Sequence, residues 1–332
     1  MAGAQASANV PADFELALEQ HRPALTGYCY RMLGSSFEAE DAVQEAYLRA
    51  WRNVDRFEGR SAFKSWLYKI ATNVCLDMLD GRKRRARPMD LSAVGTPDVA
   101  QLTTSPEATW LEPIPDARVL PETGDPAELA QERETLRLAF VNALQHLPPK
   151  QRSVLILREV LRWSAAETAE LLDTSVPSVN SALQRARASL DETGVQLADS
   201  DAGLDADEQE LLARYVKAFE AYDMDALVAL LAEDATMSMP PHDLWLIGQE
   251  HIRTWFTTAG AACNGSKLIL TSANGQPAYG QYRRNADGSG YHPWGLGVLE
   301  ISGGQVVGIN TFLDVDRLFP LFGLPPVPPD DA

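Results

Sequence analysis

The sequence predicts a multidomain protein in which two all-α domains, the second containing a helix–turn–helix, are followed by an α+β domain. Three observations lead to this prediction. Apolar residues recur at helical spacing through residues 13–87 and again through residues 136–192. An acidic, proline-rich stretch separates these two regions. After residue 205, two helical stretches are followed by segments with the composition of β-strands.

The length of the chain and the distribution of its charge restrict the classes of function that it can have. The chain has 332 residues, which suits two or three domains, and a net charge of −17. Residues 88–135 hold 2 basic against 10 acidic residues, and residues 201–332 hold 7 against 18. Residues 1–87 hold 13 against 11, and residues 136–200 hold 7 of each. The acidic charge therefore lies outside the helical regions, but neither region is basic enough to predict tight DNA binding on its own.

Several features argue against a membrane, cofactor or catalytic role. Cys29, Cys75 and Cys263 have no paired spacing, which predicts reduced, buried thiols in a cytosol. No apolar run approaches the ~20 residues that span a bilayer, and the N-terminus lacks the pattern of a signal peptide. No phosphate-binding loop, metal-ligand cluster or nucleophile triad is present in the sequence. We therefore predict a cytoplasmic protein with no cofactor, no metal, no membrane contact and no catalytic residues.

Residues 147–190 have the pattern of a helix–turn–helix. Pro149 can stand only at a helix start. Ser164 is a suitable N-cap, and Glu167 three residues later completes a capping box. Asp173 tolerates the left-handed conformation that the turn requires, and Ser175 can cap the next helix.

The second helix of this motif is the candidate DNA reader. Its apolar stripe, from Val179 to Leu190, predicts one buried face. Short polar side chains near a helix start can reach base edges in a major groove, and arginines further along suit phosphates. The residues left facing outward or sideways are Ser178, Asn180, Ser181, Gln184, Arg185 and Arg187. A purely structural helix pair is the alternative, because such pairs are common.

The first helical region contains two informative helices. Residues 37–54 show a predicted core stripe from Ala42 to Trp51, with acidic residues on another face. The helix over residues 61–79 carries Trp66 and Tyr68, which cannot both be buried on one face. It ends in the basic run GRKRRAR, which indicates either a nucleic-acid patch or a solvated helix end. Aromatic residues beside cations suit stacking on single-stranded bases.

The chain resembles the extracytoplasmic-function (ECF) sigma factors of bacterial RNA polymerase in four motifs that occur in the family's order. These are EDAVQEAYLRAWRNVDRF, FKSWLYKIATNVCLDMLDGRKRR, LPPKQRSVLILREVL and SAAETAELL…VNSALQRARASL. The resemblance implies that the first domain binds the β′ clamp of core RNA polymerase and melts the −10 element. It implies that the second domain binds the β flap and reads the −35 element of promoter DNA.

The resemblance also implies roles for particular residues. The residues placed at the core polymerase contact are Asp41, Gln44, Glu45 and Arg52. The residues placed at the −10 element are Trp66, Lys69, Asn73, Arg82 and Arg84. The outward residues of the helix–turn–helix become the −35 contacts.

The last part of the chain resembles another family. Its order αα-β-α-ββββ, opening with ELLARYVKAFEAYDMDALVALLAEDATM, is similar to the SnoaL-like fold, an α+β cone whose curved sheet encloses a pocket. The whole chain is then most similar to sigma factors that carry this fusion, a sigma-G-like actinobacterial subgroup. Candidate pocket residues are Trp245, Trp255, His292, Trp294, Phe312 and Asp314. The fold alone does not decide between ligand binding, catalysis and a structural role.

The expected domains follow from these resemblances. They are a disordered N-terminus over 1–11, sigma region 2 over 12–87, an acidic Pro-rich linker over 88–135, sigma region 4 over 136–192, a linker over 193–206 and a SnoaL-like domain over 207–325. The first linker is expected to be extended or disordered. Its Trp110, Leu111 and Ile114 nevertheless need a place to be buried.

The predicted function is that of a sigma factor whose C-terminal domain modulates its activity. One alternative is a ligand-responsive helix–turn–helix regulator, which would bind duplex DNA without polymerase. Another is a small-molecule enzyme in the C-terminal domain, which would keep its turnover after the helical regions are removed. The sequence specifies neither the promoter, nor the inducing signal, nor any anti-sigma partner.

Overall fold

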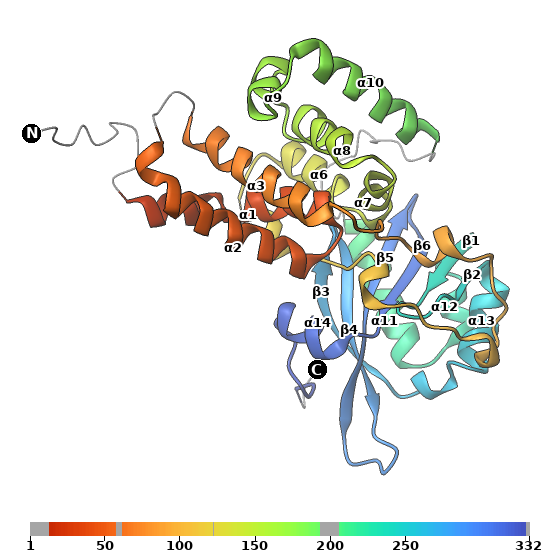
Figure 1. Cartoon of the computed structure of the whole chain (residues 1–332). Coiled ribbons are helices and arrows are strands. Elements are labelled where there is room, and N and C mark those ends of the chain that lie inside the picture. The colour runs from red at the N-terminus through yellow and green to blue at the C-terminus, as the bar shows by residue number, and fades with distance from the viewer. Residues whose placement is uncertain (1–12, 58–61, 122, 193–205, 330–332) are drawn as a thin grey trace, which may run out of the picture. The chain divides into compact units, whose positions relative to one another are not determined.

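The computed structural model describes residues 13–57, 62–121, 123–192 and 206–329. It divides into two compact units, each built from two separate stretches of chain (Figure 1). The helical unit contains the chain up to Arg85 and residues 117–200, and the α+β unit contains Ala86–Asp116 and the chain from Asp201 onward. The expected N-terminal tail over 1–11 and nearly all of the expected linker over 193–206 lie outside the described residues.

Three long helices form the first part of the helical unit. They are α1 (Phe14–Leu33), α2 (Ser36–Asn53) and α3 (Phe63–Leu79), with a short 3-10 turn η1 (Val54–Arg56) after α2. The carboxylate of Asp13 caps α1 and the hydroxyl of Ser35 caps α2. Gly34, with φ of 72°, makes the left-handed turn between these helices. Pro23 lies inside α1 without splitting it.

One predicted core residue of this region is at the surface. Trp51 of α2 is 48% exposed, because its ring packs edge-on against Phe14, with ring centroids 5.2 Å apart, instead of entering the helix interface. The core between α1, α2 and α3 is made by smaller or more central side chains, including Leu25, Ala46 and Leu67, all fully buried. Helical spacing alone does not distinguish the edge of an apolar stripe from its centre.

The second part of the helical unit consists of short helices. They are α6 (Pro126–Glu134), α7 (Leu138–Gln145), α8 (Pro149–Leu155), α9 (Ala165–Leu171) and α10 (Val176–Glu192), with a π-helical turn η4 (Ile156–Val160) after α8. Helix α1 contacts α7 and α8, and α3 contacts α8 and α9. The two predicted helical domains therefore pack against each other within one unit.

The α+β unit is built on a six-stranded sheet with the order β2-β1-β6-β5-β4-β3. The strands are β1 (Leu231–Ser238), β2 (Trp245–Ile247), β3 (Lys267–Ala273), β4 (Gln276–Arg284), β5 (Tyr291–Ser302) and β6 (Gln305–Phe312). Strands β1 and β6 are parallel, and the other neighbours are antiparallel. The predicted fold class, helical domains followed by an α+β cone, is confirmed, and β2 was not foreseen.

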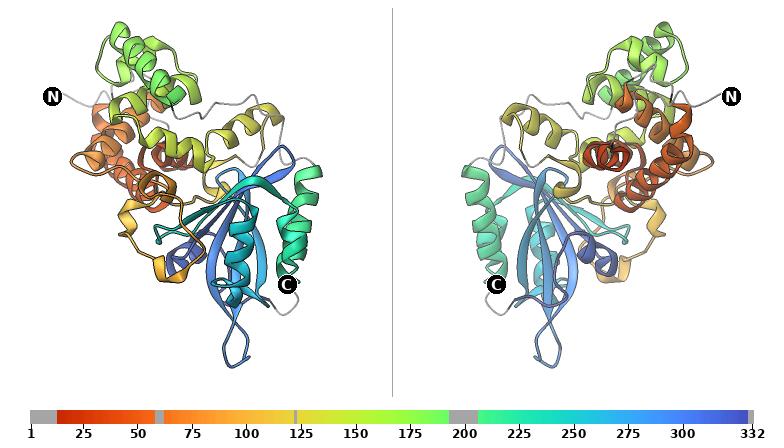
Figure 2. Two further views of the ribbon diagram at one scale, coloured as in Figure 1. Left: turned by 90° about the vertical axis from the view of Figure 1, so that its right-hand side faces the viewer. Right: turned by 90° about the vertical axis from the view of Figure 1, so that its left-hand side faces the viewer.

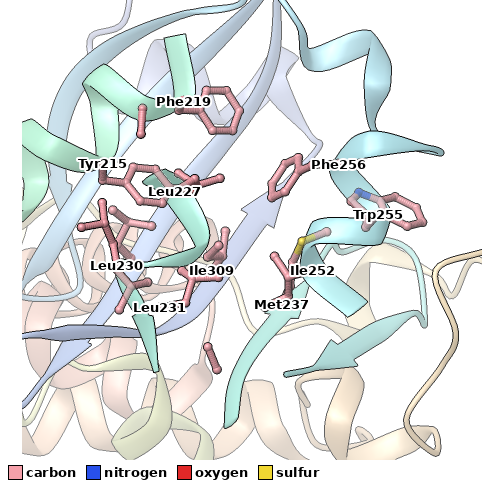
Figure 3. Packing of buried hydrophobic residues seen from close by; sticks show 14 of the residues in the cluster. Tyr215, Phe219, Leu227, Leu230, Leu231, Met237, Ile252, Trp255, Phe256 and Ile309 are labelled. Atoms are coloured by element: carbon pink, nitrogen blue, oxygen red, sulfur yellow. The ribbon is translucent and has the colours of Figure 1, made fainter. Parts of the chain in front are cut away.

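Helices cover one face of this sheet and close its core. They are α11 (Ala206–Glu220), α12 (Met224–Val228) and α13 (Gln249–Thr257) (Figure 2). The buried side chains of Tyr215, Phe219, Trp255 and Phe256 fill the space between these helices and the sheet (Figure 3). A further helix, α14 (Val315–Leu321), packs against β5.

The expected linker over 88–135 is divided between the two units. Residues 126–134 form α6 of the helical unit, whereas residues 86–116, here named the strap, belong to the α+β unit. The strap contains only short elements, namely α4 (Pro88–Leu91), η2 (Val99–Gln101), η3 (Glu107–Thr109) and the start of α5 (Asp116–Val119). Its Trp110, Leu111 and Ile114 are buried, which explains their presence in an otherwise polar segment.

Backbone and side-chain hydrogen bonds attach the strap along its length. Gly95 N–H donates to the Trp245 carbonyl (2.9 Å), and the Ile114 N–H donates to the side-chain oxygen of Asn274 (3.0 Å). Arg87 forms a 2.9 Å ion pair with Glu300 of β5 and donates to Asn310 of β6. Extended chain becomes ordered here because its polar backbone has partners in the unit.

Asp243 is the most connected acceptor for the strap. Its two carboxylate oxygens accept from the hydroxyls of Thr103 (2.9 Å) and Ser105 (2.8 Å). Its N–H donates to the Thr103 carbonyl, and its carbonyl accepts from the Ser92 hydroxyl. One side chain of the loop between β1 and β2 therefore fixes two places in the strap.

We predict that Asp243→Ala loosens the strap without unfolding the sheet. Hydrogen bonds to a charged acceptor are lost, so the free energy of unfolding of the α+β unit should fall by about 1–2 kcal/mol. Hydrogen exchange measured by mass spectrometry should speed up for peptides within residues 92–110. The matched control is Asp287→Ala, because Asp287 accepts only from Ser289 at an exposed turn. Equal protection of the strap in both variants would contradict the role of Asp243.

Candidate nucleic-acid interface

The helix–turn–helix has the local geometry that the sequence predicts. The Ser164 hydroxyl accepts from the Glu167 N–H (3.2 Å), and the Glu167 carboxylate accepts from the Ser164 N–H (2.8 Å). Asp173 has φ of 48°, the left-handed conformation expected for the turn. The Ser175 hydroxyl accepts from the Ser178 N–H at 3.3 Å. The Ser164 cap fixes where α9 begins, and the Asp173 turn with the Ser175 cap fixes the connection from α9 to α10.

Helix α10 presents one buried and one polar face. Val179, Leu183, Ala186 and Leu190 are buried. All six predicted DNA-contacting residues are exposed, namely Ser178, Asn180, Ser181, Gln184, Arg185 and Arg187. Arg187 pairs with Glu159 of η4 at 2.6 Å, whereas Arg185 has no ion-pair partner among the residues that the structure describes.

A groove of about 520 Å³ runs beside α10 on the side of η4. It is lined by Arg158, Asn180, Leu183, Gln184, Arg187, Ala188 and Asp191. One guanidinium nitrogen of Arg158 donates to the carbonyl of Trp163, while its Nε is buried without a bonded partner. Two arginines and two amides therefore line the groove with hydrogen-bond donors beside the recognition helix.

The residues expected at the −10 element lie along α3 and the segment after it. Trp66 is half-buried and stacks on Phe57, with ring centroids 5.0 Å apart, while Asn73 is exposed. Arg82 pairs with Glu38 of α2 at 2.5 Å, and Arg84 contacts a ring nitrogen of His146. The cations of this set therefore have partners inside the helical unit.

Lys69 joins the two candidate DNA surfaces directly. Its ammonium group lies 2.6 Å from the carboxylate of Asp173, the turn residue of the helix–turn–helix. Next to it, the rings of Tyr68 and Trp163 pack with centroids 5.2 Å apart, and both are buried. The face of α3 that carries Lys69 is thus in contact with α9 and its turn. No local sequence signal links Trp163 or Asp173 to α3, so this contact could not be predicted from the sequence.

The residues expected to contact core polymerase share one face of α2. Asp41, Gln44 and Arg52 are exposed, and Glu45 forms a 2.8 Å ion pair with Arg49. Leu48, which is 45% exposed, lies on the same helical face by its spacing. An exposed leucine among charged residues is a feature of protein-binding surfaces, and Leu48 is not among the predicted contact residues.

The six candidate pocket residues of the α+β unit come from β2, α13, the start of β5, the end of β6 and the N-cap of α14. Trp255 is part of the core under α13, and the indole N–H of Trp245 donates to the Ser92 carbonyl of the strap (3.0 Å). Phe312 ends β6 and is buried. None of the six lines the polar groove of about 760 Å³ that lies between α13, β1 and β2.

The other three candidates are near strand ends. His292 is exposed and bonds to Asn285 at 2.8 Å, and the Trp294 ring lies under the guanidinium of Arg283, 3.2 Å from its centroid. Burial raises the pKa of the Asp314 carboxyl, which accepts from Arg317. The pairing of Leu296 with Phe312 places Trp294, Phe312 and Asp314 at the same end of β5 and β6.

Within the described ranges, no three His, Cys, Asp or Glu side chains are grouped so that they could hold a metal ion. None of the helices in the described part of the chain is both long and apolar enough to cross a membrane.

A capped helix–turn–helix with a polar recognition helix, joined to a helical domain with aromatic and basic residues, defines a DNA-binding transcription protein with an appended α+β domain. Family models agree: sigma-70 region 2 matches residues 17–85, sigma-70 region 4 matches residues 137–190 and the SnoaL-like domain matches residues 212–309. The ECF RNA polymerase sigma factor SigG of Mycobacterium tuberculosis is 45% identical over 316 residues, which cover 94% of this chain and 84% of that protein. The chain belongs to the ECF RNA polymerase sigma factors.

Other relatives support this assignment over parts of the chain. The ECF sigma factor SigW of Bacillus subtilis is 34% identical over 169 residues, which cover 49% of this chain and 78% of that protein. The crystal structure of the M. tuberculosis ECF sigma factor SigJ matches with a TM-score of 0.60 at 23% identity, and covers 93% of this chain and 98% of that one. At this identity the structural match shows a shared fold. The predicted resemblance is confirmed, and the protein acts as a sigma factor in transcription initiation.

Proposed function

We propose that the helical unit carries both promoter-reading surfaces and the polymerase contact, and that the α+β unit regulates them without catalysis. In this proposal sigma region 2 ends near Arg85, region 4 occupies residues 136–192, and the protein works in the cytoplasm. The observation that carries it is the exposed polar face of α10 on a capped helix–turn–helix. The position of Trp255 in the core and the hydrogen bond of Trp245 to the strap support a non-catalytic α+β unit.

For the −35 element, the proposal assigns base contacts to the start of α10 and phosphate contacts to its later turns. Ser178, Asn180 and Ser181 are exposed at the end that would enter a major groove first. Arg185 is exposed without an ion pair among the described residues, so it is available to a phosphate. Arg187 would first have to leave Glu159, which makes it the weaker candidate.

For the −10 element and the polymerase, the proposal requires α3 to leave the helix–turn–helix. Lys69 and its aromatic neighbour are in contact with Asp173 and Trp163, so DNA cannot occupy the same surface at the same time. The exposed face of α2 with Asp41, Gln44, Leu48 and Arg52 remains accessible within the helical unit and suits the β′ clamp. Promoter recognition then depends on separation of regions 2 and 4, with the β flap holding region 4.

For the α+β unit, the proposal assigns control to the strap. The strap joins region 2 to region 4, and its two ends are held while it is bound to the sheet. Released and fully extended, residues 86–116 would span about 100 Å. A bound strap therefore limits how far the two promoter-reading regions can separate.

We predict different effects from two substitutions in α10. Arg185→Ala should weaken binding of the polymerase holoenzyme to all −35 sequences and reduce the salt dependence of log K by ~1. Asn180→Ala should change the preference at one base position by ~1–3 kcal/mol. Holoenzyme binding to a −35 sequence library over a salt series measures both. Arg187→Ala serves as the control with a smaller effect, and unchanged binding by all three variants would exclude α10 as the reader.

We predict that Asp41→Ala combined with Gln44→Ala weakens binding to core RNA polymerase by more than ~1 kcal/mol, about fivefold. Both side chains are exposed and leave the core of α2 intact. Affinity for core polymerase is the measurement, with Glu15→Ala in the first turn of α1 as the exposed acidic control. Core binding at wild-type affinity by the double variant would contradict the contact.

We predict that Asp243→Ala raises transcription from a region 2- and region 4-dependent promoter several-fold, because a released strap permits separation. Run-off transcription with the full chain and core polymerase is the measurement, and Asp287→Ala is again the control. The full chain is preferable to truncation after residue 200, because truncation uncovers Trp110, Leu111 and Ile114. Activity equal to wild type would reject control by the strap.

A further inference from the structure

The recognition helix α10 begins with a partly exposed valine. Val176 is its first residue and is 38% exposed, whereas Val179 and Leu183, which continue the same apolar stripe, are 0% and 6% exposed. Burial of the stripe is therefore nearly complete from Val179 onward but not at Val176. The residues around it, from Asp173 to Ser178, are all exposed. Packing within the helix–turn–helix thus does not fully account for an apolar side chain at this position.

Capping holds this end of α10 in one conformation. The Ser175 carbonyl accepts from the Val179 N–H (3.0 Å), and the Ser175 hydroxyl accepts from the Ser178 N–H (3.3 Å). Pro177, the second residue of the helix, has a backbone φ that already suits a first helical turn. A valine in a helix is largely restricted to one χ1 rotamer. The two methyl groups of Val176 are therefore held in nearly one place, and a contact with them costs little conformational entropy.

The exposed side chains at the start of α10 differ in what they offer to a base edge. The hydroxyl of Ser178 lies 2.9 Å from the hydroxyl of Ser175, so one of its hydrogen bonds is already made within the cap. Asn180 is exposed and follows Val176 by four residues, so these two side chains share one side of the helix. Along this side, DNA would meet an apolar side chain first and an amide one turn later.

We propose that Val176 contacts the 5-methyl group of one thymine in the −35 element and thereby selects that base. The inference rests on the proposed function, in which α10 reads the major groove. Thymine is the only one of the four bases that presents a methyl group in this groove, and an apolar side chain is the group that recognises it. The other three bases offer Val176 no methyl group to bury.

The geometry of α10 also limits where this thymine lies. A helix rises about 1.5 Å per residue, so Val176 and Asn180 are about 6 Å apart along the helix axis. Stacked base pairs are about 3.4 Å apart along the duplex. A helix that lies in the groove therefore carries these two side chains to bases no more than about two pairs apart. The selected thymine should lie within this distance of the position at which Asn180 sets the base preference.

The test uses holoenzyme assembled from the full chain and core RNA polymerase. A −35 library first gives the preferred sequence, and each thymine in either strand is then replaced by uracil, which lacks only the methyl group. Uracil at one position should weaken binding about three- to fivefold, the effect of one buried methyl group. Holoenzyme with Val176→Ala should bind thymine and uracil equally at that position. Equal binding of thymine and uracil at every position by the wild-type chain, or a uracil effect that persists in Val176→Ala, would overturn the proposal.

Two further variants separate a lost methyl contact from a damaged helix. Val176→Thr keeps one methyl group and should retain part of the discrimination between thymine and uracil. Leu270→Ala removes a different apolar side chain, 52% exposed on β3, and should leave the discrimination unchanged. Discrimination lost equally in Leu270→Ala would count against Val176.

The variants Asn180→Ala and Arg185→Ala distinguish this proposal from the function on which it rests. If they change binding while uracil has no effect, α10 remains the reader and the Val176 contact is rejected. If neither they nor Val176→Ala changes binding, the assignment of α10 as the reader fails, and the Val176 contact fails with it.

Discussion

The helical unit depends on two buried arginines, one from each of its two regions, that donate hydrogen bonds to the other region. Arg31 of α1 donates to the carbonyl and hydroxyl of Thr135 after α6, at 3.2 and 2.7 Å. Arg152 of α8 donates in return to the carbonyl of Met32 near the end of α1. Carbonyls at the C-terminal end of a helix lack intrahelical partners and carry partial negative charge, which suits a cation. Burial nevertheless lowers the pKa of both arginines to about 10, which is the electrostatic cost of this arrangement.

An interface of this kind fixes how the two regions pack and still allows them to separate. When the two surfaces separate, the backbone carbonyls and the guanidinium groups can form hydrogen bonds to water in place of those to each other. A purely apolar interface would instead expose all of its apolar surface to water. Opening the interface would free Lys69 from Asp173 and uncover Tyr68. Under the proposed function, this one contact therefore links polymerase engagement and DNA access in one equilibrium.

Local features of this fold could be predicted from the sequence, and long-range features could not. The caps at Ser164 and Ser175 and the left-handed Asp173 follow from spacing within a few residues. The strap could not be predicted, because burial of Trp110 depends on a sheet formed by residues far along the chain. The candidate pocket, which follows from the resemblance to the SnoaL-like fold, stays a prediction, because aromatic residues such as Trp255 are equally suited to fill a core.

The hydrophobic core of the α+β unit bears on how that unit works. Tyr215 and Tyr279 are buried in it with their hydroxyls 3.1 Å apart, so one phenol donates a hydrogen bond to the other. Phe219 and Phe256 pack edge-to-face beside them in the same described cluster. Its polar groups directed outward, above all Asp243 and Glu300, bind the strap instead. Under the proposed function, a cone that binds the interdomain chain on its surface would act on promoter recognition through that chain, since the strap is part of the covalent connection between regions 2 and 4.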